Sequence, residues 1–212
     1  MPLCTRRNPG KSRDFCFVWL KCVMGDSAAH TVLMSSKNMT PRLLLFLMLA
    51  SSICSHAQKT PCTSDPVYRQ FDFWIGDWEV FAKNGKKAGD SKIELILDSC
   101  IILENWTSAN MVNGQHYAGK SFNTYNSVTR QWQQTWVDNV GGTTEFLDGH
   151  YENQKMIFLT KPFQLNQDTL AVRRLTFYDL GREKVRQHGE ISKDNGLTWI
   201  TEYDLEYRRK KI

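Results

Sequence analysis

The chain has 212 residues, of which 41% are hydrophobic and 12% aromatic, and its formal net charge is +5. It contains no apolar run of about eighteen or more residues, so we expect no segment that crosses a bilayer as a helix. The charge excess lies before Gln58, where seven of the 27 basic and two of the 22 acidic residues are found. Because the remaining 20 basic and 20 acidic residues balance, we expect a neutral folded part that does not bind nucleic acid.

Residues 39–57 have the three-part form of a secretory signal peptide. Lys37 and Arg42 lie near its start, about eleven mostly apolar residues follow, and small residues precede a cleavage point after Ala57. This pattern predicts export, to the periplasm or the medium, and leaves no transmembrane segment once the signal is removed. A short buried helix is the alternative interpretation.

Residues 1–38 mix Gly, Ser, Lys and Arg with scattered apolar residues and show no helix or strand period. Since a signal peptide stands at the start of a protein, we interpret them as an unstructured extension or a misassigned start, with Met34 or Met39 as the initiator. Cys54 offers a competing interpretation as a lipid-anchored cysteine, but Ile53 is not the small residue that lipoprotein processing prefers before it.

Two cysteines, Cys62 and Cys100, follow the predicted cleavage site. In an exported protein they are compatible with a disulfide, which would contribute about 3 kcal/mol for a loop of this length. They are equally compatible with two free thiols in a core, so both alternatives stay open. No Cys and His grouping has the spacing of a zinc site, and no metal site is predicted.

Residues 58–70 form a polar lead-in whose prolines, Pro61 and Pro66, argue against regular structure. Residues 71–209 then consist of short runs of period two, separated by turn signals such as Asn84-Gly85. We expect ten strands and no helix, over residues 71–83, 91–97, 100–106, 116–125, 131–138, 143–151, 155–161, 170–178, 184–192 and 198–208. Regular spacing and short turns indicate an all-β, ten-stranded antiparallel up-and-down barrel, which leaves no open sheet edge. A two-sheet sandwich is the alternative.

Residues 192–199, SKDNGLTW, resemble the Asp-box hairpin of sialidases and other β proteins. The resemblance implies that Asp194 accepts backbone N–H bonds within the turn, that Gly196 takes a positive φ, and that Trp199 packs beneath the turn. The implied role is structural, and a single copy argues against a propeller.

Alternation along the strands predicts which side chains face the barrel interior. We choose the face that gathers large aromatic side chains with uncharged polar groups, because the opposite face collects lysines and arginines suited to water. The predicted ligand-binding residues of the lumen are Glu104, Trp106, Ser121, Asn123, Gln134, Trp136, Asp138, Arg174 and Gln187. Aromatic walls with a few polar groups are typical of a small-molecule pocket, and a Glu104–Arg174 pair would hold a polar ligand group.

Two other functions compete with binding of an unknown small molecule. A barrel filled by its own polar network would bind nothing and serve a structural role. An enzyme of the same cavity would use Glu104, Asp138 and Arg174, although spacing alone assigns no catalytic residue. The sequence therefore leans away from an enzyme without excluding one.

The first and last predicted strands resemble those of the calycins, the lipocalin-like barrels. The residues that carry the resemblance are Gly76 and Trp78, in a Gly-x-Trp pattern, and the pair Arg208-Arg209 near the end. The resemblance implies that Trp78 plugs the closed end of the barrel, and that Arg208 lies over the indole ring in a cation–π contact worth roughly 0.5–2 kcal/mol.

A further resemblance covers residues 71–209. The blocks FDFWIGDWEV, SKIELILDSCIILENW, GKSFNTY, WQQTWVD and VRQ, followed by the Asp-box, occur in this order. Together they are similar to an uncharacterised family of exported bacterial proteins with a lipocalin-like barrel, which supplies no activity to transfer. The ten-stranded nitrobindin-type haem barrels are more distantly similar. They imply an inward histidine as a haem ligand, for which His188 is the candidate, but alternation turns its side chain outward. No cofactor is therefore expected, with haem as the alternative.

Overall fold

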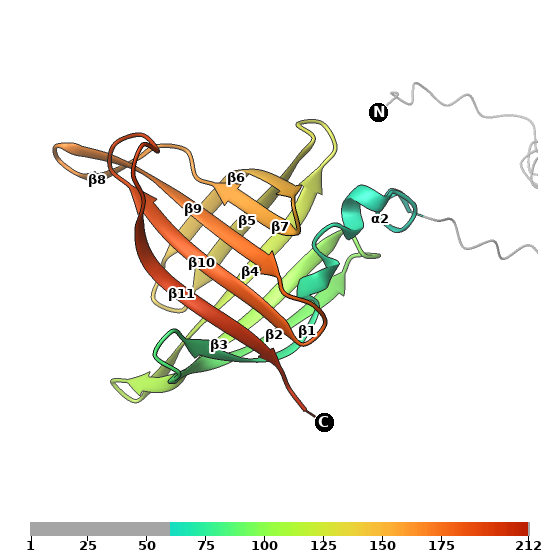
Figure 1. Ribbon diagram of the computed structural model, residues 1–212, viewed down its shortest axis with the longest axis horizontal. Coiled ribbons are helices and arrows are strands. Elements are labelled where there is room, and N and C mark those ends of the chain that lie inside the picture. The colour runs from blue at the N-terminus through green and yellow to red at the C-terminus, as the bar shows by residue number, and fades with distance from the viewer. Residues whose placement is uncertain (1–59, 212) are drawn as a thin grey trace, which may run out of the picture. The chain divides into compact units, whose positions relative to one another are not determined.

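The computed structural model describes residues 60–211 (Figure 1). The predicted extension over residues 1–38 and the signal peptide over 39–57 lie outside the described residues, so both remain predictions, as does export. Within the described residues, three short helical segments precede eleven strands. The helical segments are α2 (Pro61–Ser64), η5 (Pro66–Arg69) and η6 (Asp72–Trp74). The strands are β1 (Gly76–Ala82), β2 (Lys87–Ile96), β3 (Ile101–Val112), β4 (Gln115–Asn126), β5 (Gln131–Asp138), β6 (Thr143–Glu152), β7 (Lys155–Leu159), β8 (Phe163–Asn166), β9 (Thr169–Asp179), β10 (Lys184–Ser192) and β11 (Ile200–Arg209).

Ten of these strands close into an antiparallel up-and-down barrel, which confirms the predicted fold class. Strands β1 to β7 pair in sequence, β9, β10 and β11 continue the sheet, and β11 returns to β1 with Trp78 opposite Arg209. The short strand β8 was not predicted. It pairs with β9 in a hairpin that projects from the barrel at the left of Figure 1.

The helical segments close one end of the barrel and correct the predicted start of the first strand. Strand β1 begins at Gly76, and the aromatic run before it forms η6. The expectations of no helix and of no regular structure in the lead-in are wrong. Its prolines begin helical turns, because a proline at the first helical position lacks only an N–H that has no helical partner. Phe71 and Trp74 are fully buried, with ring centroids 5.1 Å apart, and Phe71 also contacts Trp132 and Phe177.

Trp78 completes this plug, as the calycin resemblance implies, but with a different arginine. Its indole Nε1–H donates to the Trp74 carbonyl at 2.8 Å, and the Arg209 guanidinium lies 4.3 Å from the centre of its rings. The prediction that named Arg208 is wrong, because Arg208 lies over the Phe81 ring at 4.2 Å on the outer surface. One residue of register on β11 decides which arginine faces the plug.

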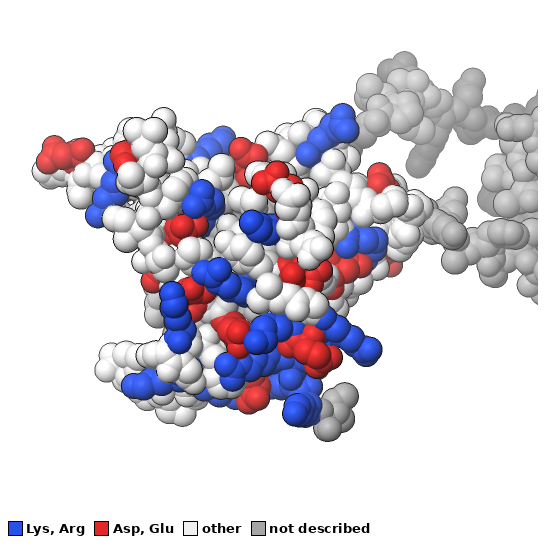
Figure 2. All heavy atoms as spheres, viewed as in Figure 1, with Lys and Arg blue, Asp and Glu red and all other residues white. Residues whose placement is uncertain are grey.

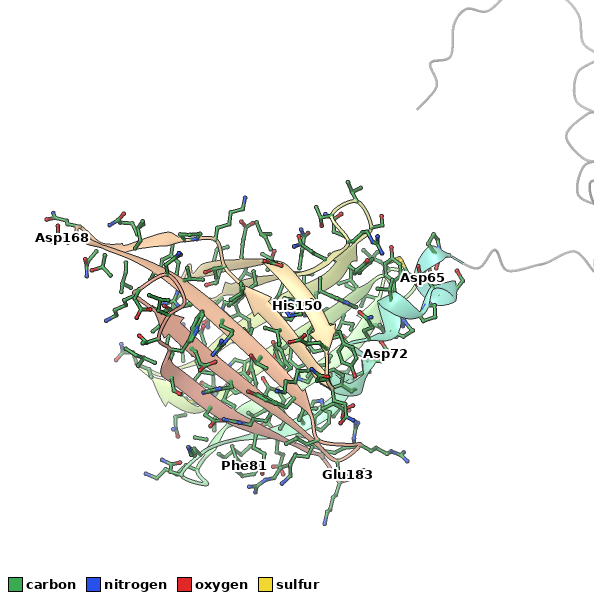
Figure 3. The ribbon with its side chains drawn as sticks, turned by 45° about the horizontal axis from the view of Figure 1, so that its top comes forward. Asp65, Asp72, Phe81, His150, Asp168 and Glu183 are labelled. Atoms are coloured by element: carbon green, nitrogen blue, oxygen red, sulfur yellow. A yellow bond between two sulfur atoms is a disulfide. The ribbon has the colours of Figure 1, made fainter. Side chains whose placement is uncertain are left out.

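A disulfide joins Cys62 and Cys100, whose Cα atoms are 4.9 Å apart. It resolves the open choice between a bridge and free thiols, and it ties α2 to the turn between β2 and β3. Arg69 donates to the Ser99 carbonyl in the same turn. In Figure 3, Asp65 and Asp72 mark this end of the molecule, and Asp168 marks the opposite end, at the tip of the β8–β9 hairpin.

Charged side chains of both signs are interspersed on the face shown in Figure 2. Several of them form ion pairs between the outer faces of neighbouring strands, as Arg186 does with Asp204 at 2.7 Å. The arrangement matches the balanced charge of the sequence after Gln58. The absence of nucleic-acid binding stays a prediction.

Candidate functional site

A cavity of about 490 Å³ occupies the half of the barrel away from the plug. Its lining comes from β3, β4, β5, β6, β9, β10 and β11. The volume lies within the range of small-molecule sites. The side chains of the barrel therefore do not fill the interior of this half.

Glu104 lies at the floor of this cavity and is only 3% exposed. Its carboxylate accepts hydrogen bonds from the Ser91 hydroxyl at 2.9 Å, the Ser121 hydroxyl at 3.0 Å and the Tyr207 hydroxyl at 3.2 Å. Burial raises the pKa of Glu104 to about 7, and the bonds from Ser91, Ser121 and Tyr207 oppose that rise. Among the described residues, no cationic side chain forms a salt bridge with it.

The hydrogen bonds at the floor continue on both sides of Glu104. On one side, the Asn123 amide donates to Ser121 at 3.0 Å, and the Gln134 amide donates to Asn123 at 2.7 Å. On the other, the Tyr207 hydroxyl lies 2.8 Å from Oε1 of Gln187, closer than it lies to Glu104. The single Tyr207 proton serves one acceptor at a time, so a neutral Glu104 that donates to Tyr207 satisfies this side of the network.

Aromatic side chains form the walls between the floor and the mouth. Trp106, Tyr117, Trp136 and Tyr203 line the cavity, and Phe146 adds a further ring. The Trp136 Nε1–H donates to the Tyr117 hydroxyl at 3.2 Å, which fixes these two side chains relative to each other. The walls thus present aromatic rings to a ligand, together with a few polar atoms.

Asp138 lines the mouth, where its carboxylate holds the turn between β5 and β6. Its Oδ1 accepts the backbone N–H of Gly142 at 2.7 Å and of Val140 at 3.0 Å, and its Oδ2 accepts the Tyr117 hydroxyl at 3.0 Å. The Gly142 N–H is the main cause that lowers the pKa of Asp138. An ionised turn acceptor is poorly suited to the acid–base partnership with Glu104 that the enzyme hypothesis needs.

The predicted inward position of Arg174 is wrong. On β9 the inward side chains are Ala171, Arg173, Leu175 and Phe177, and all of them except Arg173 are nearly fully buried. Arg174 lies on the outer face, where it binds Glu190 at 2.9 Å and stacks on the Trp199 ring at 4.1 Å. The apolar side chains of β9 face the barrel interior, and this register turns Arg174 outward. The expected Glu104–Arg174 pair therefore does not form.

Arg173, the neighbour of Arg174, reaches the mouth of the cavity instead. Its guanidinium makes two bonds to the Glu202 carboxylate, at 2.8 and 3.1 Å. This fork-to-fork geometry uses both oxygens of Glu202 and two nitrogens of Arg173. The mouth therefore carries a self-neutralised ion pair.

His188 lies on the outer face of β10, as its alternation predicts. Its Nε2 is 3.0 Å from the Thr201 hydroxyl, and its Nδ1 is 3.6 Å from Glu190. It does not line the cavity. The histidine named for the haem alternative is thus not placed to bind a group inside the barrel.

The Asp-box turn has the geometry that its resemblance implies. Asp194 accepts the backbone N–H of Thr198 at 2.8 Å, Gly196 has a φ of +88°, and the Trp199 Nε1–H donates to the Gly196 carbonyl at 3.1 Å. Hydrogen bonds from Thr198 and Ser192 lower the pKa of Asp194 to about 2. The turn stabilises the outer face beside Arg174 and contributes nothing to the cavity.

Six of the nine predicted lumen residues line the cavity, and two lie just behind its floor. The six are Glu104, Trp106, Gln134, Trp136, Asp138 and Gln187. Ser121 and Asn123 are fully buried and support Glu104 and Gln134 through hydrogen bonds. The prediction missed the inward side of β11, namely Tyr203, Leu205 and Tyr207, although apolar and charged residues alternate there with period two.

No family model matches the sequence, and a search of curated proteins finds no significantly similar chain. Within residues 60–211, no helix is long and apolar enough to cross a membrane. The same described residues contain no group of three or more His, Cys, Asp or Glu side chains arranged to hold a metal ion. The closed antiparallel barrel is compatible with a calycin-like fold.

Proposed function

We propose that this protein is an exported, calycin-like barrel that binds a small molecule with both aromatic and polar character in its cavity. The observation that carries the proposal is the open volume of about 490 Å³ above a buried polar floor. A barrel with a purely structural role has no need to leave such a volume unfilled, since close packing stabilises an interior. Export is inferred from the signal-peptide pattern of residues 39–57, and membership of the lipocalin-like family from sequence resemblance.

The composition of the cavity supports binding more strongly than catalysis. Its walls are aromatic, and its polar groups sit on the barrel strands, which hold them in fixed positions. Of the three residues that the enzyme hypothesis combined, Arg174 lies outside the barrel and Asp138 holds a turn. Glu104 alone has the raised pKa of an acid–base group, and one such group is also what a binding site for a polar ligand contains.

A thermal-shift screen tests this proposal with a variant that narrows the mouth. Thr144 lines the cavity near its opening, so we expect Thr144→Trp to abolish the rise in Tm that a binding compound gives to the unmodified protein. Val137→Trp is the matched control, because Val137 lies on the neighbouring strand and is exposed. We expect this second variant to keep the shift.

Equal ligand-induced shifts in both tryptophan variants would contradict binding inside the barrel. Circular dichroism and the Tm without ligand show whether Thr144→Trp is folded. If that variant does not fold, Leu205→Ala tests the same site, because it enlarges the wall and should change the affinity for bulky compounds relative to small ones. An unchanged ranking of compounds would then count against the cavity.

A further inference from the structure

We propose that the ligand of this cavity carries a protonated amine, held by the Glu104 carboxylate at the floor and by the aromatic walls around it. This inference rests on the proposed function and narrows it to one ligand class, the organic ammonium ions. It follows from the charges that the cavity presents, from the acceptor capacity of Glu104 and from the aromatic side chains that line the same cavity.

The charged groups of the cavity leave a carboxylate without a cation. Arg173 is the basic side chain in the lining, and both of its bonds go to Glu202. Glu104 has hydroxyl partners but no salt-bridge partner among residues 60–211. Asp138 adds a second negative charge nearer the mouth. A buried carboxylate is costly unless a cation pairs with it, and a ligand can supply that cation.

Glu104 also has room for one more donor. A carboxylate offers about four acceptor positions. When Glu104 is ionised and the Tyr207 proton turns toward it, three of them are used, two on Oε1 by Ser91 and Tyr207 and one on Oε2 by Ser121. An ammonium group supplies three donors, and the amide oxygens of Gln134 and Gln187 at the same floor are further acceptors for it. The floor thus offers several acceptors to one cationic head group.

The aromatic walls suit both the cationic group and the apolar part of such a ligand. Trp106, Trp136, Tyr117 and Tyr203 line the volume above Glu104. The face of an aromatic ring attracts an ammonium ion within about 6 Å, and the attraction strengthens as the ion loses its water. Carbon atoms of the ligand would pack against the same rings.

The protonation state of Glu104 distinguishes an ammonium ligand from a neutral ligand by the pH dependence of their affinities. An ammonium ligand needs the ionised carboxylate, so its affinity rises with pH while the amine stays charged. A neutral ligand that accepts a hydrogen bond from protonated Glu104 shows the opposite trend. Since the pKa of Glu104 is about 7, the ammonium ion should bind about tenfold more tightly at pH 8 than at pH 6.

The tyrosines and Asp138 that face the cavity keep their protonation states between pH 6 and pH 8. Burial raises the pKa of Tyr117 and Tyr207, so both stay neutral, and the Gly142 N–H holds the pKa of Asp138 low, so it stays ionised. Burial raises the pKa of Tyr203 in the same way. Arg173 and Glu202 form their own pair at the mouth. His116 contacts the Ser108 carbonyl at the mouth, and a His116→Gln variant is the control for its contribution.

Calorimetric titration with three matched indoles tests the inference. The probes are tryptamine, which is cationic, indole-3-ethanol, which is neutral, and indole-3-propionate, which is anionic. We expect tryptamine to bind at least tenfold more tightly than the other two at pH 8, and its affinity to fall about tenfold at pH 6. Glu104→Gln should remove both differences, whereas His116→Gln should leave them unchanged.

Equal or tighter binding of indole-3-ethanol, or tryptamine binding that weakens as the pH rises, would overturn the amine inference and leave small-molecule binding in place. If none of the three probes binds, the inference that the cavity takes an aromatic ammonium ion is overturned. The failure of the proposed function is a separate result, because it shows as equal ligand-induced Tm shifts in the Thr144→Trp and Val137→Trp variants.

Discussion

Glu104 combines a buried position, hydroxyl partners and contact with the cavity. Its two protonation states arrange the floor differently. When it is neutral, it donates to Tyr207, which in turn donates to Gln187; when it is ionised, the Tyr207 proton turns toward Glu104. The residue therefore links the pH to the hydrogen-bond donors and acceptors that a ligand meets.

The raised pKa of Glu104 predicts a loss of stability with rising pH. The native state keeps this proton up to a pH of about 7, whereas the unfolded state releases it near the ordinary value of 4.5. Between these two values the unfolded state binds fewer protons, so the free energy of unfolding falls as the pH rises, by about 3 kcal/mol over the whole window. Glu104→Gln cannot lose this proton, and its stability should not fall for this reason.

Urea unfolding of both proteins at pH 5 and pH 8 measures this effect. The difference between them isolates Glu104, because carboxylates with lowered pKa values, such as Asp138 and Asp194, are common to both. We expect the stability of the unmodified protein, relative to the variant, to fall by about 2 to 3 kcal/mol from pH 5 to pH 8. A constant difference would show that Glu104 has an ordinary pKa.

At the scale of single elements, the plug depends on the close approach of β11 to the start of β1. Gly76 has a φ of +144°, and a Cβ atom there would overlap Nη1 of Arg209. Arg209 also donates to the Ile75 and Arg182 carbonyls. A side chain at Gly76 would strain the backbone and displace the guanidinium that covers Trp78.

We expect Gly76→Ala to destabilise the protein by about 3 kcal/mol, from backbone strain and the loss of the Arg209–Trp78 contact. Gly85→Ala is the matched control, because Gly85 also has a positive φ, of +81°, but no atom lies within 4 Å of the position that a Cβ atom would take there. It should cost about 1 kcal/mol. In an Arg209→Ala background, the cost of Gly76→Ala should shrink toward that of the control. Additive effects in denaturant unfolding would contradict the expected coupling between the two positions.

The elements also show where sequence patterns were informative. Alternation predicted the inward faces of β3, β4 and β5, because each has one face that is mostly apolar, aromatic or uncharged polar, with residues such as Ile102 and Ser121. It failed on β9, where Arg173 and Arg174 put a charge on both faces and only the buried Leu175 and Phe177 distinguish them. On β11, the adjacent Arg208 and Arg209 likewise put a charge on both faces, so the sequence did not show which arginine covers Trp78.

The plug could not be predicted from local patterns. The aromatic run from Phe71 to Ile75 has strand propensity, yet residues 72–74 form a helical turn. The reason is tertiary, because Phe71 and Trp74 fill the end of the barrel against Phe177, far away in sequence. The disulfide between Cys62 and Cys100 holds the preceding turns in place, and pairing between cysteines is likewise not specified by local sequence.

At the scale of the whole molecule, the barrel divides into two halves with different interiors. The half near the helical segments is filled by Phe71, Trp74, Trp78 and the rings around them. The other half holds the cavity, with Glu104 and Tyr207 near the boundary between the two. The packed half fixes the strands, and strands fixed in this way keep the polar groups of the cavity in place without a ligand.

Native mass spectrometry of the protein purified from its own host tests the central claim, which is that the cavity binds a small molecule. We expect the spectrum to contain the protein with an added small mass, and the Thr144→Trp variant from the same host to lack it, while Val137→Trp retains it. A bare protein mass in all three, together with no Tm shift across a broad panel of compounds that includes tryptamine, would contradict the claim.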